Sequence, residues 1–281
     1  MLRQRAGGSE DFRGNEFHGW AFVNTGVITA DIVLIDTIDV RTSAVLLDVD
    51  GTLLDIAATP REVDVPSQLK KALKKICERT EGATAFISGR PLADLDRLFA
   101  PLKMPAVAGH GAELRVTGKG EPSKYNISIG SDLRGRFAAF AKMHDGIILE
   151  DKGYSLALHY RLAPQHEAIV REAVAAATAR YPASSIEILP GKEVIEVKSA
   201  AFNKGTGIRE LMKYPPFRGR RPVFIGDDVT DESGFAVLPE FGGFGFSVGR
   251  ELTGLAGTFA RPRDVRNWLY RAAGLDGAGQ P

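Results

Sequence analysis

An apolar run that ends abruptly in acidic residues places the strongest constraint on this chain. Residues 43–48 read SAVLLD, and the letters VDGT follow directly. A short continuous apolar run is typical of a strand that is buried on both faces of a parallel sheet. Asp and Gly are also common turn residues, so the stretch taken alone is open to a simple turn. The residues at the ends of the other predicted strands therefore decide between these interpretations.

The composition excludes several classes of protein. Among 281 residues, 36 are basic and 35 acidic, and this balance leaves no charged footprint for nucleic acid or a membrane surface. The balance still allows a binding site for a small anionic ligand, because such a site depends only on the charge around it. The single cysteine, Cys77, cannot form an internal disulfide. No apolar run is long enough to span a bilayer, and residues 1–26 lack the apolar segment of a secretory signal, so we expect a cytoplasmic protein.

Two parts of the chain alternate predicted strands with predicted helices. The strands are expected at 43–48, 83–87, 105–109 and 222–228, and the helices at 69–76, 92–99, 203–214 and 265–273. Such alternation indicates a mainly parallel sheet. The segment between them differs, because residues 154–162 alternate with period two and are followed by a helix at 163–181 and strands at 186–189 and 194–198. This pattern predicts an antiparallel sheet with helices on one face.

These patterns predict a two-part α/β fold, in which a Rossmannoid parallel-sheet core with helices on both faces carries an inserted α+β domain. We place the core at residues 41–114 and 200–273, the insert at 115–199, an N-terminal extension at 1–40 and a tail at 274–281. The extension is expected to be flexible, although residues 27–35 are open to being an extra edge strand. In the insert, Glu196 and Lys198 are predicted to project from the strand face opposite Ile195.

Polar residues follow the predicted core strands where those strands end. They are Asp48, Asp50 and Thr52 after the first strand, Ser88, Gly89 and Arg90 after the second, and Asp227 and Asp228 after the last, with Lys204 opening the preceding helix. In open α/β sheets ligands bind beyond the carboxyl ends of the strands, so these segments are expected to converge on one site. Each segment alone is also explained as a loop or a solvated surface. Their order and spacing together favour a site.

Carboxylates gathered at one place predict a particular chemistry. They repel one another and raise each other's pKa unless a cation lies among them, and hard oxygen ligands favour Mg²⁺. An aspartate can act as a nucleophile that forms an acyl phosphate, while a second carboxyl two residues on can protonate the leaving oxygen and later activate water. A lysine and the metal would offset the charge on a transferring phosphoryl group. The residues therefore indicate Mg²⁺-dependent phosphoryl transfer.

Four motifs, DVDGTLLD, SGR, NKG and GDDVTDE, occur in an order that resembles the haloacid-dehalogenase-like (HAD) phosphatase superfamily. Further segments, HGAELR at 110–115, LHYRLAPQHE at 158–167 and GKEVIEVK at 191–198, look like those of trehalose-6-phosphate phosphatases. The resemblance covers about residues 43–270. It implies an HAD-like core with a cap domain, and hydrolysis of trehalose 6-phosphate through an aspartyl-phosphate intermediate with Mg²⁺. That reaction is the last step of trehalose biosynthesis, so the resemblance also implies a functional pairing with a trehalose-6-phosphate synthase.

The resemblance implies a role for each matching residue. Asp48 would be the nucleophile, Asp50 the general acid and base, and Thr52, Ser88, Gly89 and Lys204 would hold the phosphoryl group. The implied metal ligands are Asp48, Asp50 through its carbonyl, Asp227 and Asp228, with Asp231 in support. The implied substrate contacts are Arg90 and, on the cap, Glu150, Lys152, Lys192 and Glu196.

Other interpretations stay open at this point. Another sugar phosphatase or a phosphosugar mutase would share the core chemistry, and only the cap would distinguish them. A catalytically silent sugar-phosphate binding or sensing module is disfavoured, because pure binding needs no nucleophile beside an acid; fold alone would not settle this. Of the histidines, His159 is expected to pack in the sheet, and His110 to shape a domain junction rather than to ligate a metal.

Overall fold

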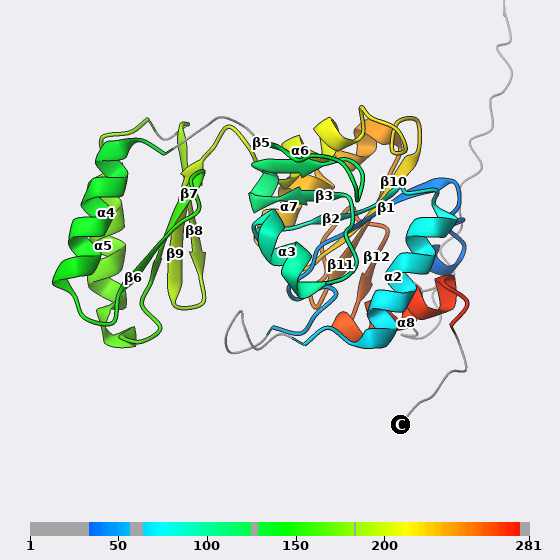
Figure 1. Ribbon diagram of the computed structural model, residues 1–281, viewed down its shortest axis with the longest axis horizontal. Coiled ribbons are helices and arrows are strands. Elements are labelled where there is room, and N and C mark those ends of the chain that lie inside the picture. The colour runs from blue at the N-terminus through cyan, green and yellow to red at the C-terminus, as the bar shows by residue number, and fades with distance from the viewer. Residues whose placement is uncertain (1–33, 57–63, 125–128, 183, 276–281) are drawn as a thin grey trace, which may run out of the picture.

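The computed structural model describes residues 34–56, 64–124, 129–182 and 184–275. It has two sheets, each with its own helices (Figure 1). Most of the predicted extension and tail lies outside the described residues. Of the stretch 27–35, only Leu34 and Ile35 are described, where they lie in a helical turn, and Ile35 is buried.

The larger sheet has eight strands in the order β12-β11-β10-β1-β2-β3-β4-β5. Their bounds are β1 Ser43–Leu47, β2 Thr84–Ile87, β3 Ala106–Ala108, β4 Glu113–Arg115, β5 Ser123–Lys124, β10 Arg221–Gly226, β11 Phe244–Val248 and β12 Gly257–Phe259. The six strands from β12 to β3 are parallel, and β4 and β5 add an antiparallel edge. The sheet thus takes up residues 123–124, which the sequence pattern assigns to the insert.

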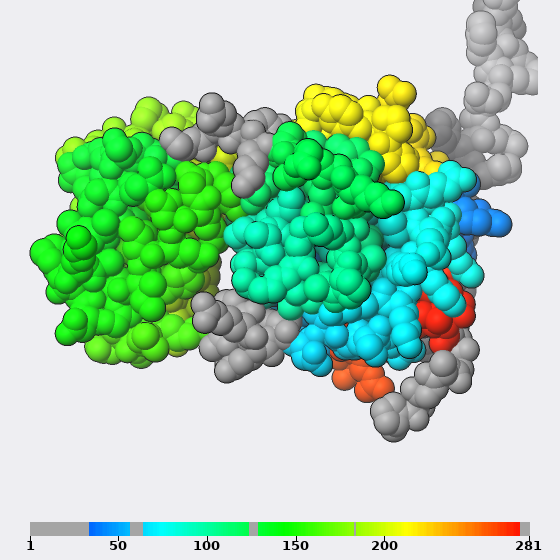
Figure 2. Space-filling model, viewed as in Figure 1, coloured from blue at the N-terminus to red at the C-terminus, as the bar shows by residue number. Residues whose placement is uncertain are grey.

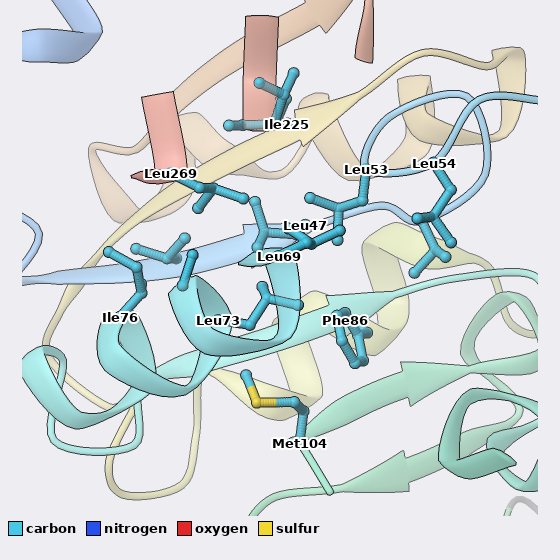
Figure 3. Close-up of a cluster of buried hydrophobic side chains, with 14 of the residues drawn as sticks. Leu47, Leu53, Leu54, Leu69, Leu73, Ile76, Phe86, Met104, Ile225 and Leu269 are labelled. Carbon is cyan, nitrogen blue, oxygen red and sulfur yellow. The ribbon is translucent and has the colours of Figure 1, made fainter. Parts of the chain in front are cut away.

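Helices cover both faces of this sheet, as predicted. The helices are α2 Ser67–Arg79, α3 Leu92–Leu98, α6 Lys204–Leu211, α7 Val229–Phe235 and α8 Pro262–Ala272. Leu47 of β1 packs with Leu69 and Leu73 of α2 and with Leu269 of α8 (Figure 3). Leu46 points to the opposite face, where it joins a second cluster with residues of α6 and α7. The continuous apolar run in β1 is therefore explained by burial on both faces.

A smaller domain, residues 129–199, is built on a four-stranded antiparallel sheet in the order β6-β7-β9-β8. Its strands are β6 Ile148–Asp151, β7 Ser155–His159, β8 Ile186–Gly191 and β9 Val194–Ser199, and its helices are α4 Ser131–Met143 and α5 Glu167–Thr178. Figure 1 shows both helices on the sheet face that points away from the core domain. In the space-filling view the two domains are separate bodies that meet along a seam (Figure 2).

The other face of the small sheet turns toward the core domain, and strand register decides what it presents. Ile195 and Val197 of β9 are buried against the helices, so Glu196 and Lys198 project from the opposite face, as predicted. Glu196 pairs with Ala157, and Ala157 pairs with Glu150 on β6. This row carries two carboxylates toward the core domain.

Tyr154 departs from the predicted alternation. Leu156 and Leu158 belong to the apolar cluster of the smaller domain, but Tyr154 precedes β7 and packs with Ala112 and Phe202 of the core domain. It therefore forms a contact between the domains. In the described residues, no helix is both long and apolar enough to cross a bilayer.

Candidate active site

Parallel pairing brings the ends of β1 and β10 to one edge of the core sheet. Leu47 lies beside Ile225 in register, and the backbone N–H of Asp48 donates to the carbonyl of Ile225 (2.9 Å). Asp48 and Asp227 therefore leave their strands side by side. Ser88 follows β2, the neighbour of β1 on its other side, and is 1% exposed. The predicted convergence of these strand ends is observed.

The loop after β1 fixes the carboxylate of Asp227. Gly51 has a φ of +79°, and a Cβ added there would overlap that carboxylate. The hydroxyl of Thr52 donates to Oδ1 of Asp227 (2.9 Å). Thr52, which the motif assigns to phosphate binding, thus bonds to a carboxylate in this structure. The Gly-Thr pair lets the loop approach closely and then holds Asp227 in place.

A buried lysine joins two of the carboxylates. Asn203 caps α6 by accepting from the backbone N–H of Thr206, which starts the helix at Lys204, as predicted. The Nζ atom of Lys204 lies 2.8 Å from Oδ1 of Asp48 and 2.7 Å from Oδ1 of Asp231. Burial alone would lower the pKa of Lys204, but the two carboxylates raise it above its ordinary value. The lysine is therefore a fixed positive charge.

Three carboxylates gather around this lysine. One oxygen each from Asp48, Asp227 and Asp231 lies within 4.8 Å of the others. Burial raises the pKa of Asp48 well above its usual range against the opposing charge of Lys204, and burial also raises the pKa of Asp227. Both oxygens of Asp231 are already bonded, one to Lys204 and the other to backbone N–H groups. Asp48 and Asp227 therefore have the greater capacity to hold a cation, and their hard oxygens fit Mg²⁺.

Asp228 does not join this group. It is exposed, and its Oδ1 accepts from the backbone N–H of Val229 (2.6 Å), so it caps α7. Asp231, three residues on, reaches back to the backbone N–H of Asp228 (3.0 Å). The capping contacts at the start of α7 thus turn Asp228 outward and Asp231 inward, although the motif places both acids together.

Arg250 is a residue that the sequence analysis misses. Its Nε donates to the carbonyl of Asp227 (2.9 Å), and its guanidinium also pairs with Glu232 of α7. It stands alone after β11 with no surrounding motif, so the sequence carries no signal for this contact.

Asp50 is held by a bidentate arginine contact. Nε and one terminal nitrogen of Arg90 each lie 2.6 Å from a carboxylate oxygen of Asp50. The backbone N–H of Arg90 donates to the Ser88 hydroxyl (3.1 Å). This fork geometry fixes the orientation of the Asp50 carboxylate.

In the smaller domain, two of the predicted substrate residues pair with each other. Lys152 Nζ lies 2.9 Å from Oε2 of Glu196, and each side chain is 12% exposed. Burial would raise the pKa of Glu196, but the positive charge of Lys152 outweighs it, so the pKa of this carboxyl is lowered. The Ser155 hydroxyl lies close enough to add to this lowering. The pair is a preformed polar feature on the sheet face that turns toward the core.

The remaining predicted residues of this domain are Glu150 and Lys192. Nε2 of His159 lies 2.8 Å from Oε2 of Glu150, and this hydrogen bond lowers the pKa of Glu150. His159 lies in β7, as expected for a sheet residue, and its partly exposed ring also orients the Glu150 carboxylate. Lys192 is exposed in the turn between β8 and β9.

Comparisons with known proteins agree with one another. Residues 46–253 match the family model described as trehalose-phosphatase. A trehalose-6-phosphate phosphatase of Escherichia coli K12 is 38% identical over 79% of this chain and 83% of its own length. A probable trehalose-phosphate phosphatase of Sinorhizobium fredii is 36% identical over 75% and 79%.

Solved structures share the fold. The C-terminal domain of a Candida albicans trehalose-6-phosphate phosphatase superposes with a TM-score of 0.72 at 22% identity, covering 89% of this chain and all of that one. A HAD-superfamily phosphatase of Bacteroides thetaiotaomicron gives a TM-score of 0.58 at 16% identity over 84% and 96%. At these identities the likeness shows a HAD-like fold.

Proposed function

This chain is an enzyme of the trehalose-phosphatase family, and from that premise we propose that it hydrolyses trehalose 6-phosphate to trehalose and phosphate. Two relatives of 36–38% identity carry trehalose phosphatase names, and they share most of their length with this chain. The proposal extends to an aspartyl-phosphate mechanism and to Mg²⁺ as the cofactor.

The observation that carries the proposal is the buried contact of Lys204 with Asp48. A carboxylate held at a strand end against a fixed cation is positioned to attack an electrophile, whereas a binding site would need no such nucleophile. Lys204 would also offset the charge of the phosphoryl oxygens as they approach Asp48. Ser88, buried beside this edge, can donate its hydroxyl to one of those oxygens.

In the proposed reaction, an oxygen of Asp48 attacks phosphorus and the bond from phosphorus to the sugar oxygen breaks. Asp50 gives a proton to that oxygen, so trehalose leaves as a neutral alcohol. Asp50 then takes a proton from a water molecule that attacks the phosphorus, and the bond to Asp48 breaks to release phosphate. Arg90 holds the Asp50 carboxylate through two contacts in this structure, so one of them has to open before Asp50 carries the proton that it gives.

Asp48 and Asp227 are the side chains that would hold Mg²⁺, together with the backbone carbonyl of Asp50. When bound, Mg²⁺ would supply positive charge beside the phosphoryl oxygens and relieve the repulsion between the carboxylates. Asp228 is also proposed as a ligand by resemblance, but its capping contact with Val229 makes it the weakest member of the set.

The smaller domain would act as the cap that closes over the sugar and excludes water. Its inward face carries Glu150, Lys152 and Glu196, whose charged groups suit the hydroxyl-rich surface of a disaccharide. Lys192, on its exposed turn, would join them only at the rim of the site.

The test is phosphate release from a substrate panel: trehalose 6-phosphate, sucrose 6-phosphate, glucose 6-phosphate, mannose phosphates and p-nitrophenyl phosphate, with Mg²⁺ or with a chelator. We expect a strong preference for trehalose 6-phosphate that the chelator abolishes. Asp48→Asn is the matched inactive variant, and its turnover should fall by about a thousandfold or more.

Other outcomes separate the parts of the proposal. Release from several sugars without preference would keep the core chemistry and overturn the assignment of the cap. Normal turnover by Asp48→Asn would overturn the nucleophile. A functional pairing with a trehalose-6-phosphate synthase and a cytoplasmic location stay predictions.

A further inference from the structure

His110 lies where the core and the smaller domain meet. It sits in the 3-10 turn after β3, Gly109–Gly111, with a φ of +55°. Its backbone N–H donates to the carbonyl of Ser88 (3.0 Å). Its ring lies so close to Gly89 that a Cβ there would overlap the imidazole. The ring is therefore fixed over the segment that carries the proposed phosphate-binding residues.

Charges in both domains act on this ring. Glu196 favours its charged form, whereas Lys152 and Lys198 of the smaller domain and Lys204 of α6 oppose it. His110, Lys198 and Lys204 also line a cavity of about 60 Å³. A space of this size holds one or two water-sized groups, and a sugar hydroxyl has that size. The cavity thus places the imidazole beside Lys204 of the core domain and Lys198 of the smaller domain.

The ring has unused hydrogen-bonding capacity. Burial lowers the pKa of His110 to about 3, so the imidazole is neutral, with one nitrogen as donor and the other as acceptor. Nδ1 is buried and has no hydrogen-bond partner among the residues that the structure describes. A buried polar atom without a partner lowers the stability of the fold, and the left-handed backbone of a non-glycine residue adds strain. A partner that arrives with the substrate would recover part of this cost.

We propose that His110 contacts the glucose ring that carries the phosphate, and that its neutral imidazole shares a hydrogen bond with a hydroxyl of that ring. This inference rests on the proposed function. It adds a specificity residue from the core domain to the charged residues of the cap. A site built to bond a hydroxyl discriminates strongly against a substrate that lacks it, because the buried group is then left unpaired.

The first test compares two substrates with His110→Asn. Asparagine tolerates a positive φ, so the turn is kept while the imidazole is removed. We expect the ratio of kcat/KM for trehalose 6-phosphate to kcat/KM for p-nitrophenyl phosphate, which has no sugar, to fall about tenfold or more. Glu81→Asn is the control, because Glu81 has a φ of +54° in the turn before β2, at the opposite edge of the sheet.

A second measurement does not depend on turnover. In the inactive Asp48→Asn background, calorimetry with Mg²⁺ present should show that His110→Asn weakens trehalose 6-phosphate binding by about tenfold. The affinity for inorganic phosphate, which probes the phosphoryl end alone, should stay the same.

Several results would overturn the inference. Equal losses on both substrates, or equal weakening of phosphate binding, would mean that His110 only shapes the Ser88 segment. A wild-type chain that does not hydrolyse trehalose 6-phosphate would overturn the proposed function together with the inference. Wild-type hydrolysis with an unchanged substrate ratio in His110→Asn would overturn the inference alone.

Discussion

Nζ of Lys204 lies 2.8 Å from Oδ1 of Asp48, and the two side chains are only 3% and 5% exposed. The same nitrogen also bonds to Asp231, whose side chain is fully buried. One cation thus offsets part of the repulsion between two carboxylates where water cannot screen it. Lys204 therefore contributes both to the stability of the fold at this edge of the sheet and to the position of Asp48, the proposed nucleophile.

Replacing Lys204 by methionine should therefore affect both properties. The change leaves two buried carboxylates unpaired, so we expect unfolding free energy to fall by about 3–5 kcal/mol. Turnover of trehalose 6-phosphate should fall about a hundredfold or more, because charge stabilisation at the phosphoryl group is lost. Urea unfolding and phosphate release measure the two effects. Lys74→Met, on the exposed face of α2, should change neither, and near-normal turnover by Lys204→Met would contradict the assigned role.

We predict that activity requires glycine at position 51 because it lacks a side chain, and not only because of its positive φ. In Gly51→Ala the new Cβ would overlap the carboxylate of Asp227, so turnover and Mg²⁺ binding should both fall about tenfold or more. Gly219 is a matched control, because its φ is +81° and no atom lies within 4 Å of an added Cβ. Gly219→Ala should cost only about 1 kcal/mol of stability. Similar activity in the two variants would mean that Asp227 can move without penalty.

Asp227 and Asp228 are adjacent acids for which different roles are expected. Asp227→Asn should raise the Mg²⁺ concentration needed for half-maximal activity about tenfold or more, because the neutral amide lacks the negative charge of the carboxylate. Asp228→Ala removes the cap of α7 and should lower stability by about 0.5–2 kcal/mol, with a smaller change in the Mg²⁺ requirement. Mg²⁺ titration of activity and thermal unfolding of both variants give the comparison. An equal rise in the Mg²⁺ requirement of both variants would mean that Asp228 binds the metal as Asp227 does.

The convergence of Asp48, Lys204 and Asp227 could be predicted from the sequence for a physical reason. Buried parallel strands are readable as apolar runs, and their carboxyl ends must meet at one edge of the sheet. The roles of Asp228 and Asp231 could not be separated in the same way. Which acid turns inward depends on where α7 begins, and the capping contacts that set this are visible only in three dimensions.

Contacts that depend on strand register could not be predicted from the sequence either. The Glu150–His159 contact requires β6 to pair with β7, and β6 has no clear alternation that would mark it as a strand. Arg250 reaches the Asp227 carbonyl from the end of β11, a strand that the sequence pattern did not resolve. Short strands and lone arginines give too little periodic signal to place a contact.

The Lys152–Glu196 pair should recognise the sugar rather than the phosphate. Glu196→Ala should lower kcat/KM for trehalose 6-phosphate about tenfold or more, and affect p-nitrophenyl phosphate far less. Lys152→Ala should behave similarly, and the double variant should lose less than the sum, because the two side chains are in contact. Equal losses on both substrates would mean that the pair does not recognise the sugar. Lys192→Ala tests in parallel whether the exposed turn takes part.

The enclosed imidazole of His110 predicts a pH dependence of stability. Its pKa in the folded chain is lowered to about 3, against 6.5 for a free histidine, chiefly because burial disfavours the charged form. Glu196 favours that form, and Lys204, Lys152 and Lys198 oppose it. Above about pH 6.5 both states are neutral and the group contributes no pH dependence. As pH falls from 6.5 toward 3, only the unfolded state takes up the proton, so stability is lost. Unfolding free energies of wild type and His110→Asn should therefore converge or cross below pH 6.5, with a slope difference of at most about 1.4 kcal/mol per pH unit. Parallel curves across that range would show that the ring can protonate in the folded protein.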